Sequence, residues 1–421
     1  MLIGLFFFFL FMGIPIVFSM ALSALAVIVI DDLPLLIIIQ RLFAGSDSFI
    51  LTAIPFFILA GSLMSAGGIT IRLIEFSQAL IGHIRGGLAL VNILASMIFG
   101  GVSGSATADT AAIGGILIPA MEKEGYHRDF SGAVTAASAT LGIVIPPSIP
   151  MILFGVVAGE SIGRLFLGGF IPGIMVAVGM MIPTYFISKK RNYPKHARVT
   201  LGQLIKSFWR SFWALAMPVF IVGSIVAGIV TPTEAGVLAV FYAAFVGFAV
   251  YGELRIADLP KIMRNTVSTT ASVMIIMAVA SIFSWVLANM EIPQQIAEAI
   301  WSTTHNKYVI LLLINVFLLI IGTFVDLGPA IIITVPILMP LVKLVGIDPV
   351  HFGLIVTVNL GIGLFTPPVG TNLYICCSVA KISLEKISRA ELPYILFSIL
   401  ILMIITYFPI TVLLIPDLFM H

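Results

Sequence analysis

Leu141-Gly-Ile-Val-Ile-Pro-Pro-Ser-Ile-Pro150 is the stretch that decides the fold of this chain, and Ile362-Gly-Leu-Phe-Thr-Pro-Pro-Val-Gly-Thr371 is its second copy. Gly142, Pro146 and Pro147 of the first stretch recur 221 positions later in the second. The same interval relates four further pairs: Pro119 and Pro340, Gly125 and Gly346, Gly132 and Gly353, and Pro172 and Pro393. Because proline and glycine control the backbone conformation, this shared spacing predicts one three-dimensional unit used twice.

Each double proline is predicted to break an apolar helix. Pro146 and Pro147 lack N–H donors, and their rings clash with the preceding turn. The break frees backbone carbonyls, and such carbonyls, together with helix ends, hold ions in membrane transporters. A lone double proline more often marks a simple kink. Two at matched positions, with Thr366 before the second, favour paired ion and substrate sites in the two halves of a secondary transporter.

Composition indicates a membrane protein. Of the 421 residues, 60% are hydrophobic, with 21 Lys and Arg against 19 Asp and Glu, whereas a soluble domain is about 25% charged. Apolar runs of about 17 to 25 residues, long enough to cross a bilayer, recur from end to end and predict an all-α polytopic fold. Met1 to Ile30 lacks the basic start of a signal peptide and is expected to be a retained helix. No basic, aromatic-rich surface suggests nucleic acid, and Cys376 and Cys377 are expected to be small buried hydrophobes.

The positions of Lys and Arg predict the topology. The most basic loop joins the two copies and is predicted to lie in the cytoplasm; it contains Lys189, Lys190, Arg191, Lys195, Arg198, Lys206 and Arg210. The N-terminus is then inside and the C-terminus outside. A loop with Asp31, Asp32 and Asp47 and a weakly acidic stretch from Glu291 to Lys307 are expected outside.

Two segments are predicted to be re-entrant hairpins. Residues 88–120 have Arg85 near one end and Lys123 near the other, so both ends are expected in the cytoplasm. The tip of such a hairpin is expected to be buried against protein or to line water, because lipid cannot satisfy its backbone groups. Residues 308–340 are predicted to form the matching hairpin, which enters from outside.

The two copies are therefore expected to be inverted repeats. Residues 1–187 form the first, with the hairpin at about 88–120 and the broken helix at 131–158. Residues 188–232 form the basic loop and a connector helix. Residues 233–421 form the second repeat, with the hairpin at about 308–340 and the broken helix at 353–378.

The tip of the first hairpin, Ser103 to Thr110, offers hydroxyl oxygens of the kind that suits Na⁺. Close helix packing by small residues is the alternative explanation. Asp109 and Asp326 place carboxylates in the two hairpins, and ionisable residues at membrane depth are functional candidates by default. A nucleophile elbow at Ser103 is disfavoured, because Ser105 stands where that motif requires glycine.

Several motifs are similar to those of one known family: Phe99-Gly-Gly-Val-Ser-Gly-Ser-Ala-Thr-Ala-Asp109, Ile118-Pro-Ala-Met121, Thr231-Pro-Thr-Glu-Ala235 and Gly363-Leu-Phe-Thr-Pro-Pro-Val-Gly370. With the Pro146-Pro147 break, they make the chain resemble the large membrane subunit of tripartite ATP-independent periplasmic (TRAP) transporters over essentially its whole length. The resemblance implies a scaffold and a moving transport domain, an elevator, in the bacterial inner membrane. It implies Na⁺-driven uptake of a small organic acid, such as a sialic acid or a C4-dicarboxylate. It also implies two partners, a small four-helix membrane subunit as a separate chain and a periplasmic substrate-binding protein.

The resemblance further implies at least two Na⁺ sites and a substrate site. The first Na⁺ would bind Ser103 and Ser105 with carbonyls of Gly142, Ile145 and Pro147. The pseudo-symmetric Na⁺ would bind Thr323 and Asp326 with Gly363, Thr366 and Pro368. The substrate between the hairpins would meet Asp109, Ser148, Thr371 and Asn372.

Three other functions compete with this interpretation. A stand-alone Na⁺/carboxylate symporter of the same architecture would need no binding protein. An intramembrane enzyme would need a paired nucleophile and base, or a metal set, at membrane depth, and the sequence offers neither. A channel is a further alternative, but duplicated broken helices favour alternating access.

Overall fold

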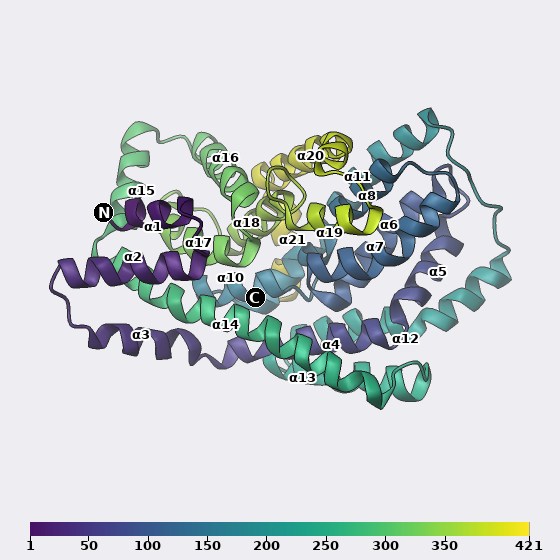
Figure 1. Ribbon diagram of the computed structural model, residues 1–421, viewed down its shortest axis with the longest axis horizontal. Helices are drawn as coiled ribbons and strands as arrows, with labels where there is room; N and C mark the ends of the chain where they lie inside the picture. The colour runs from purple at the N-terminus through teal and green to yellow at the C-terminus, as the bar shows by residue number, and fades with distance from the viewer. Residues whose placement is uncertain (421) are drawn as a thin grey trace.

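Helices make up all the regular structure of residues 1–420, the part of the chain that the computed structural model describes. The first repeat contains α1 (Leu2–Phe11), α2 (Ile16–Ile30), α3 (Leu36–Ser46), η1 (Phe49–Thr52), α4 (Ala53–Ala66), α5 (Ile69–Ile81), α6 (Gly87–Ser103), α7 (Ala106–Lys123), α8 (Arg128–Ser138), α9 (Leu141–Val144), α10 (Ile149–Ala158) and α11 (Ile162–Lys190) (Figure 1). The rest contains α12 (Leu201–Val226), α13 (Pro232–Phe245), η2 (Val246–Val250), η3 (Ile256–Asp258), α14 (Leu259–Asn289), α15 (Ile292–Thr303), α16 (Lys307–Phe324), α17 (Leu327–Leu344), α18 (Pro349–Gly363), α19 (Thr371–Ala380), α20 (Leu384–Tyr407) and α21 (Ile410–Phe419).

The predicted repeat is visible in the helix bounds. Shifting α7 by the 221-residue interval of the prolines reproduces the bounds of α17, and α6 maps onto α16 to within one residue. Pro119 and Pro340 both lie inside helices, while Gly125 and Gly346 both take positive φ, +85° and +67°, just beyond them. Glycine adopts this conformation without the strain that a side chain would cause. The repeated glycines and prolines therefore mark equivalent helix ends.

Within residues 1–420, eight helices are long and apolar enough to cross a membrane, or nine if the bent pair Arg128–Val144 and Ile149–Ala158 counts as one span. Many large hydrophobic side chains of this chain are exposed, as a surface in contact with lipid requires. The chain is an all-α polytopic membrane protein, as predicted.

One layer of the molecule is built from helices of both repeats. α4 packs against α13 and α14, α14 packs against α2 and α3, and α12 packs against α5. In Figure 1 α3, α4, α13 and α14 lie along the lower edge of the molecule. This layer is called the scaffold layer below.

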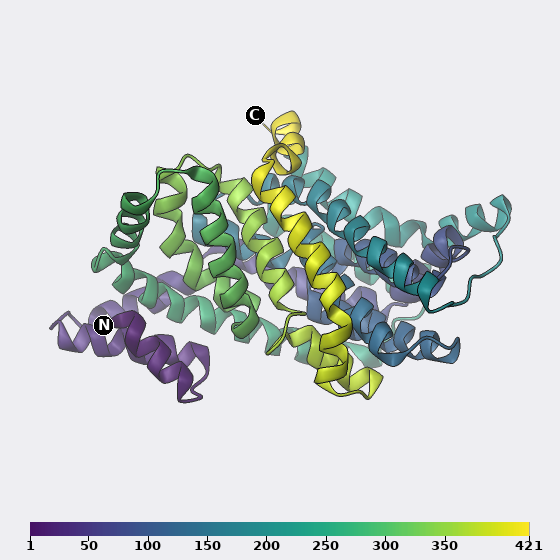
Figure 2. The same cartoon turned by 90° about the horizontal axis from the view of Figure 1, so that it is seen from above.

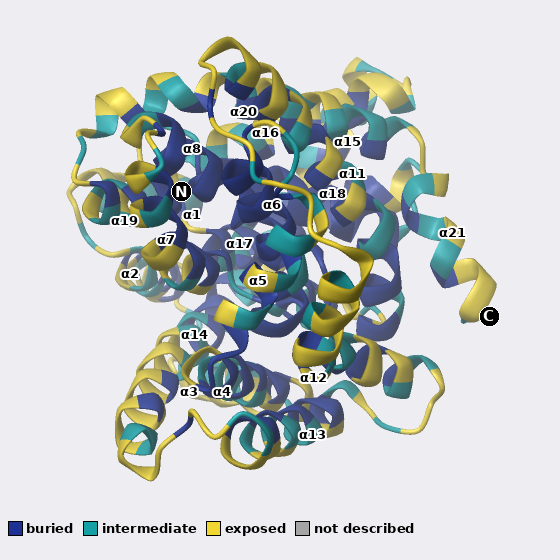
Figure 3. Cartoon of the chain, turned by 90° about the vertical axis from the view of Figure 1, so that its right-hand side faces the viewer, coloured by how far each residue is buried: buried dark blue, intermediate teal, exposed yellow. Residues whose placement is uncertain are grey.

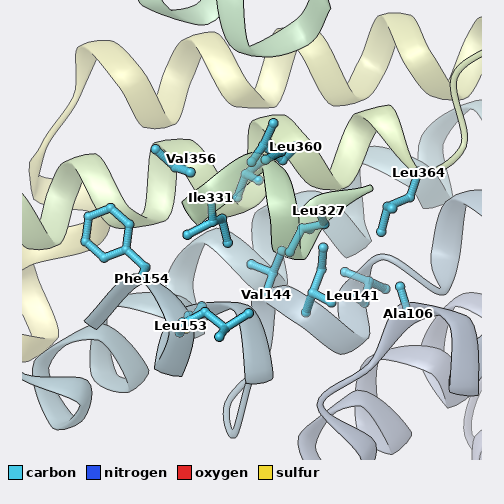
Figure 4. Packing of buried hydrophobic residues seen from close by; sticks show 14 of the residues in the cluster. Ala106, Leu141, Val144, Leu153, Phe154, Leu327, Ile331, Val356, Leu360 and Leu364 are labelled. Atoms are coloured by element: carbon cyan, nitrogen blue, oxygen red, sulfur yellow. The ribbon is translucent and has the colours of Figure 1, made fainter. Parts of the chain in front are cut away.

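The hairpins and broken helices form the other layer, and their two halves interlock. α10 of the first repeat packs against α17 and α18, while α19 of the second packs against α7 and α8. Figure 4 shows Leu153 and Phe154 of α10 beside Leu327 and Ile331 of α17 and Val356 of α18. Buried residues gather around α6 and α17 (Figure 3). In Figure 2, α20 runs along the other helices of the second repeat.

The N-terminal prediction of one helix over Met1 to Ile30 is wrong. The structure has two helices there, α1 and α2, because Gly13 takes φ +82° and Pro15 follows it. The predicted loop with Asp31, Asp32 and Asp47 is also partly helical, since α3 lies between these aspartates.

Two further loops are shorter than predicted. Lys206 and Arg210 belong to α12, which begins at Leu201 behind a capping box of Thr200 and Gln203. The stretch from Glu291 to Lys307 contains the amphipathic helix α15, whose Ala297 is buried against α17.

Both ends of the α6–α7 hairpin contact the basic loop. Gly86 N–H donates to the Pro194 carbonyl at 3.1 Å before α6 begins. Glu124, just after α7, lies 3.2 Å from the imidazole of His196. The two ends therefore lie on one face of the protein, and the tip at Gly104 lies away from it.

A buried amide cluster joins the second hairpin to its broken helix. Asn359 Nδ2 of α18 donates to Asn315 Oδ1 of α16 at 2.8 Å, and Asn315 Nδ2 donates to Thr406 Oγ1 at 3.0 Å. The first repeat has a similar cluster, in which Asn92 Nδ2 donates to Thr135 Oγ1 at 2.7 Å. Side-chain hydrogen bonds of this kind hold helices together where water is absent.

Replacing Asn359 with leucine is expected to destabilise the folded protein by about 1–3 kcal/mol, because a buried polar group of Asn315 loses its partner. Thermal unfolding in detergent measures the effect. Ser272→Ala is the matched control, since Ser272 bonds only within its own helix at an exposed position. Equal melting temperatures for Asn359→Leu and Ser272→Ala would show that the amide cluster does not hold the two helices together.

Candidate functional site

The tip of the first hairpin is a tight turn between two serines. α6 ends at Ser103, Gly104 takes φ +63°, and Ser105 caps α7 by accepting a hydrogen bond from Ala108 N–H at 3.4 Å. Ser105 N–H in turn donates to Ser103 Oγ at 3.2 Å. Gly104 adopts the left-handed conformation, which glycine tolerates without strain. The turn brings the two hydroxyls to the end of the hairpin.

The first broken helix opens between Val144 and Ile149. Ile145 is extended (φ −79°, ψ 127°), and the Pro146–Pro147 peptide bond is cis, as is Pro367–Pro368. The two halves of this span are bent by 45°. Ser148 is buried here, where its hydroxyl donates to the Ile143 carbonyl at 2.6 Å and accepts from Met151 N–H at 3.3 Å.

The tip of the hairpin lies against this break. Ile149 N–H donates to the Gly104 carbonyl at 3.3 Å. The Pro147 carbonyl oxygen lies 3.0 Å from the position that a Cβ on Gly104 would occupy. The structure therefore brings Ser103, Ser105 and the Pro147 carbonyl into one region.

Asp109 lies at the same junction and is completely buried. One carboxylate oxygen, Oδ1, accepts a hydrogen bond from Ser103 Oγ. The other, Oδ2, is buried without a hydrogen-bond partner and lies against Gly142, where a Cβ would collide with it. A buried charge is costly unless it is paired, so this geometry suits a cation beside Asp109.

The second hairpin meets the second broken helix in the same way. Asp326 is the N-cap residue of α17 and is separated from the end of α16 by Val325 alone. A Cβ on Gly363, at the end of α18, would collide with the backbone of Gly322 in α16. Beyond the break, the carbonyl oxygens of Leu364 and Thr366 lie 3.1 Å from the position of a Cβ on Gly370.

A cavity of ≈ 10 Å³ lies at this second junction, large enough for about one water or ion. Thr323, Asp326, Gly363 and Thr371 are among its lining residues. The Thr371 hydroxyl is buried without a hydrogen-bond partner. Thr366 and Pro368 lie outside this lining, and the Thr366 hydroxyl donates to the Ile362 carbonyl at 2.6 Å.

A larger cavity, of ≈ 150 Å³, lies between the two hairpin tips. The tips contribute Gly104 to Thr107 on one side and Asp326 to Gly328 on the other. The scaffold layer closes the cavity with Ile58 of α4 and with Thr269 and Val273 of α14. This is where a small molecule would touch both repeats and the scaffold layer at once.

None of the four predicted substrate residues lines this cavity. Asp109, Ser148, Thr371 and Asn372 are absent from its lining. Asn372 is buried and links the repeats, since its Nδ2 donates to the Ala136 carbonyl of α8 at 3.1 Å. Asp109 and Thr371 instead lie at the first and second junctions.

Sequence reasoning missed the scaffold side of the site. Thr269 and Asn265 lie on α14 at a spacing of four, and Lys261 continues this row one turn earlier. Three polar side chains at this spacing share one face of a helix. The first half of α14 carries other polar residues as well, so this row does not stand out in the sequence alone.

The donor chemistry of both junctions is oxygen. No group of three or more His, Cys, Asp or Glu side chains within residues 1–420 is placed to hold a metal ion. The available ligands are hydroxyls, carbonyls and single carboxylates, which suit hard cations better than transition metals.

Comparison with known protein families identifies the family of this chain. The family model described as the tripartite ATP-independent periplasmic transporter, DctM component, matches residues 3–411. The chain belongs to this family. The DctM family is one of transporter permeases, so the resemblance to TRAP large subunits is confirmed.

Three relatives show the range of the DctM family. The chain is 40% identical to the sialic acid TRAP transporter large permease SiaM of Vibrio cholerae, over 98% of this chain and 96% of that one. It is 39% identical to the C4-dicarboxylate large permease DctM of Pseudomonas aeruginosa, over 90% and 88%. It is 44% identical to the isethionate permease DctMQ of Oleidesulfovibrio alaskensis, over 97% of this chain but 65% of that relative.

Solved structures share the fold at low sequence identity. The YdaH transporter of Alcanivorax borkumensis has a TM-score of 0.64 and 15% identity, over 88% of this chain and 86% of that one. MtrF of Neisseria gonorrhoeae has a TM-score of 0.57 and 14% identity, over 87% and 82%. At these identities the two structures show a shared fold alone.

Proposed function

We propose that this chain carries a small organic acid anion across the bacterial inner membrane, coupled to Na⁺ and moved by an elevator mechanism. The observation that carries the proposal is the pair of junctions at which a polar hairpin tip meets a broken helix. Each junction gathers oxygen ligands, and a cavity lies between the two tips. Family membership supports secondary transport as the activity.

The first Na⁺ would bind at the junction of Ser103, Ser105 and the Pro147 carbonyl, with Asp109 supplying the negative charge. The unpartnered Oδ2 of Asp109 supports this placement. The second Na⁺ would bind near Thr323, Asp326 and the Gly363 backbone, where the ≈ 10 Å³ cavity lies. Thr371 would belong to this second ion site rather than to the substrate.

The substrate would bind between the hairpin tips. Ser105, Thr107 and Thr269 offer hydroxyls to the ≈ 150 Å³ cavity, and cations at the two junctions would balance the charge of an acid. Relatives named for sialic acid, C4-dicarboxylates and isethionate support a small organic acid as the substrate class.

The membrane potential would assist this uptake. Two Na⁺ entering with a monoanion carry one net positive charge inward, and about 100 mV makes that charge worth roughly 2.3 kcal/mol. A dianion with two Na⁺ would be electroneutral, and a third cation would then be needed for the potential to contribute.

The elevator would move the hairpin layer against the scaffold layer. Both hairpin ends at residues 86 and 124 meet the basic loop, which supports a re-entrant first hairpin and a cytoplasmic position for this face. The N-terminus would be cytoplasmic and the C-terminus periplasmic.

Transport would depend on two partners, a small four-helix membrane subunit and a periplasmic binding protein. We expect proteoliposomes with this chain alone to take up little labelled sialic acid, C4-dicarboxylate or isethionate in a Na⁺ gradient. Adding both partners should restore uptake of one of these acids at least tenfold, because the binding protein delivers the substrate. The control is the complete system with K⁺ in place of Na⁺.

Each outcome of that assay is informative. Full activity of the chain alone would favour the stand-alone symporter over the tripartite system. Equal uptake in Na⁺ and K⁺ by the complete system would contradict Na⁺ coupling.

A further inference from the structure

A second large cavity, of ≈ 570 Å³, adjoins the cavity between the hairpin tips. The two cavities share Ile58, Ser105, Thr107, Ile149 and Thr269. From this shared wall, the larger cavity extends between the first hairpin and the scaffold layer as far as Asp258 and Lys261. A molecule leaving the hairpin tips in this direction would pass along α14.

One face of α14 lines this route with polar groups. Thr269, Asn265 and Lys261 lie one helical turn apart and are exposed to the cavity. Ser62 and Ser65 of α4 stand on the same wall. The row begins near the hairpin tips with the hydroxyl of Thr269 and ends with the ammonium group of Lys261.

The end of the row lies on the face that carries the basic residues. Arg72, after α4, forms a salt bridge of 2.8 Å with Glu253, shortly before α14. Ser211 Oγ, within α12, donates to the Arg72 carbonyl at 2.9 Å. The end of α4, the segment after α13 and the start of α14 therefore lie together beside α12, on the side that the charge rule assigns to the cytoplasm.

We propose that Thr269, Asn265 and Lys261 form the scaffold-side release path for the anion, with Lys261 as the residue that draws it to the cytoplasm. This inference rests on the proposed transport function and adds the direction and the residues of substrate release. The row belongs to the scaffold layer, so it stays in place while the hairpins move. The anion then passes from moving ligands to fixed ones.

The charges along the path favour this role for Lys261. Lys261 and Asp258 are the charged residues of the cavity wall. The carboxylate of Asp258 already has a partner, since the backbone N–H of Arg255 donates to Asp258 Oδ2 at 3.1 Å. Lys261 forms no salt bridge within residues 1–420, so its ammonium group is available to an anion.

The test compares Lys261→Gln with Lys261→Arg and Arg264→Gln in the complete transport system with both partners. Arg264 lies on the same helix end but does not line the cavity, so it is the matched control. Lys261→Gln is expected to lower the maximal uptake rate about tenfold, the lower end of the range for electrostatic guidance. Lys261→Arg should retain most of the rate, and Arg264→Gln should match the unmodified protein.

Salt and thermal stability separate this role from a structural one. The deficit of Lys261→Gln should shrink when choline chloride raises the ionic strength, since salt screens an exposed charge. Its Na⁺-induced thermal stabilisation should equal that of the unmodified protein. If Na⁺ does not stabilise the unmodified protein against heat, that result contradicts the proposed function itself. If Lys261→Gln transports at the normal rate, or if its lower rate does not change with salt, only the proposed release path is overturned.

A labelling experiment tests the direction of the path. In a Cys376→Ser/Cys377→Ser background, a cysteine placed by Asn265→Cys should react with a membrane-impermeant maleimide from the cytoplasmic side. A cysteine placed by Ser272→Cys, on the same helix but outside the cavity wall, is the control for general reactivity. Reaction of Asn265→Cys from the periplasmic side only would overturn the proposal.

Discussion

Replacing Gly363 with alanine is expected to abolish Na⁺-dependent uptake, with a loss of at least a hundredfold. A Cβ at this position would come closer than 3.0 Å to backbone atoms of Gly322, a contact that real Cβ atoms essentially never make. Neither backbone can yield locally, because α16 and α18 pack against each other along their length. The hairpin would therefore be displaced from the broken helix, and a displacement of about 1 Å in a reactive or binding geometry costs on the order of 10²-fold.

Gly115→Ala is the matched control for this experiment. Gly115 also lies inside a hairpin helix, but nothing stands within 4 Å of the Cβ that alanine would add. Uptake, expression and the melting temperature with and without Na⁺ should be measured for both variants. Gly363→Ala is expected to lose the stabilisation by Na⁺ as well as uptake. Normal Na⁺-dependent uptake in Gly363→Ala would show that the close approach to Gly322 does not shape the ion site.

The repeat could be predicted from the sequence because its markers act through covalent structure. A proline pair interrupts a helix whatever surrounds it, and so residues 131–158 and 353–378 contain the two broken helices, within a few residues of the observed bounds. Gly125 and Gly346 likewise end the hairpins at positions where only glycine is relaxed.

Helices without such markers were harder to predict. α3 and α15 fall in stretches whose acidic residues suggested loops. Their formation depends on packing against α14 and α17, two helices far away in the sequence. Tertiary contacts of this kind outweigh local composition, and a single sequence does not show them.

The residues of the candidate site also fall into those that the sequence could place and those that depend on tertiary packing. Ser103 and Ser105 could be placed at the tip of the first hairpin because the turn residues around them define that tip. The orientation of Asp109 could not be predicted, since one turn of helix decides whether a side chain meets the cavity or the broken helix. Thr269 and Lys261 reach the site only through the packing of the scaffold layer against the hairpin layer.

Asp109 provides the second large expected effect. Asp109→Asn keeps the shape of the side chain and an oxygen that can accept from Ser103, but it removes the buried negative charge. In the unmodified protein, Na⁺ at 100 times its dissociation constant should stabilise the folded state by about 2.7 kcal/mol per site. The variant is expected to lose most of this stabilisation at the first site and to need at least tenfold more Na⁺ for half-maximal uptake.

The stability without Na⁺ makes the result specific. Most buried substitutions destabilise a protein, but Asp109→Asn should melt at the same or a higher temperature in Na⁺-free buffer, because Oδ2 has no partner there and a buried unpaired charge is costly. Ser148→Ala is the comparison, since Ser148 is also buried near the break but bonds only to its own chain segment. If Asp109 instead contacts the substrate, Asp109→Asn will raise the substrate concentration for half-maximal uptake and leave the Na⁺-induced thermal shift intact. That outcome would remove the carboxylate from the ion site and leave Ser103, Ser105 and the carbonyls of the break to hold the ion.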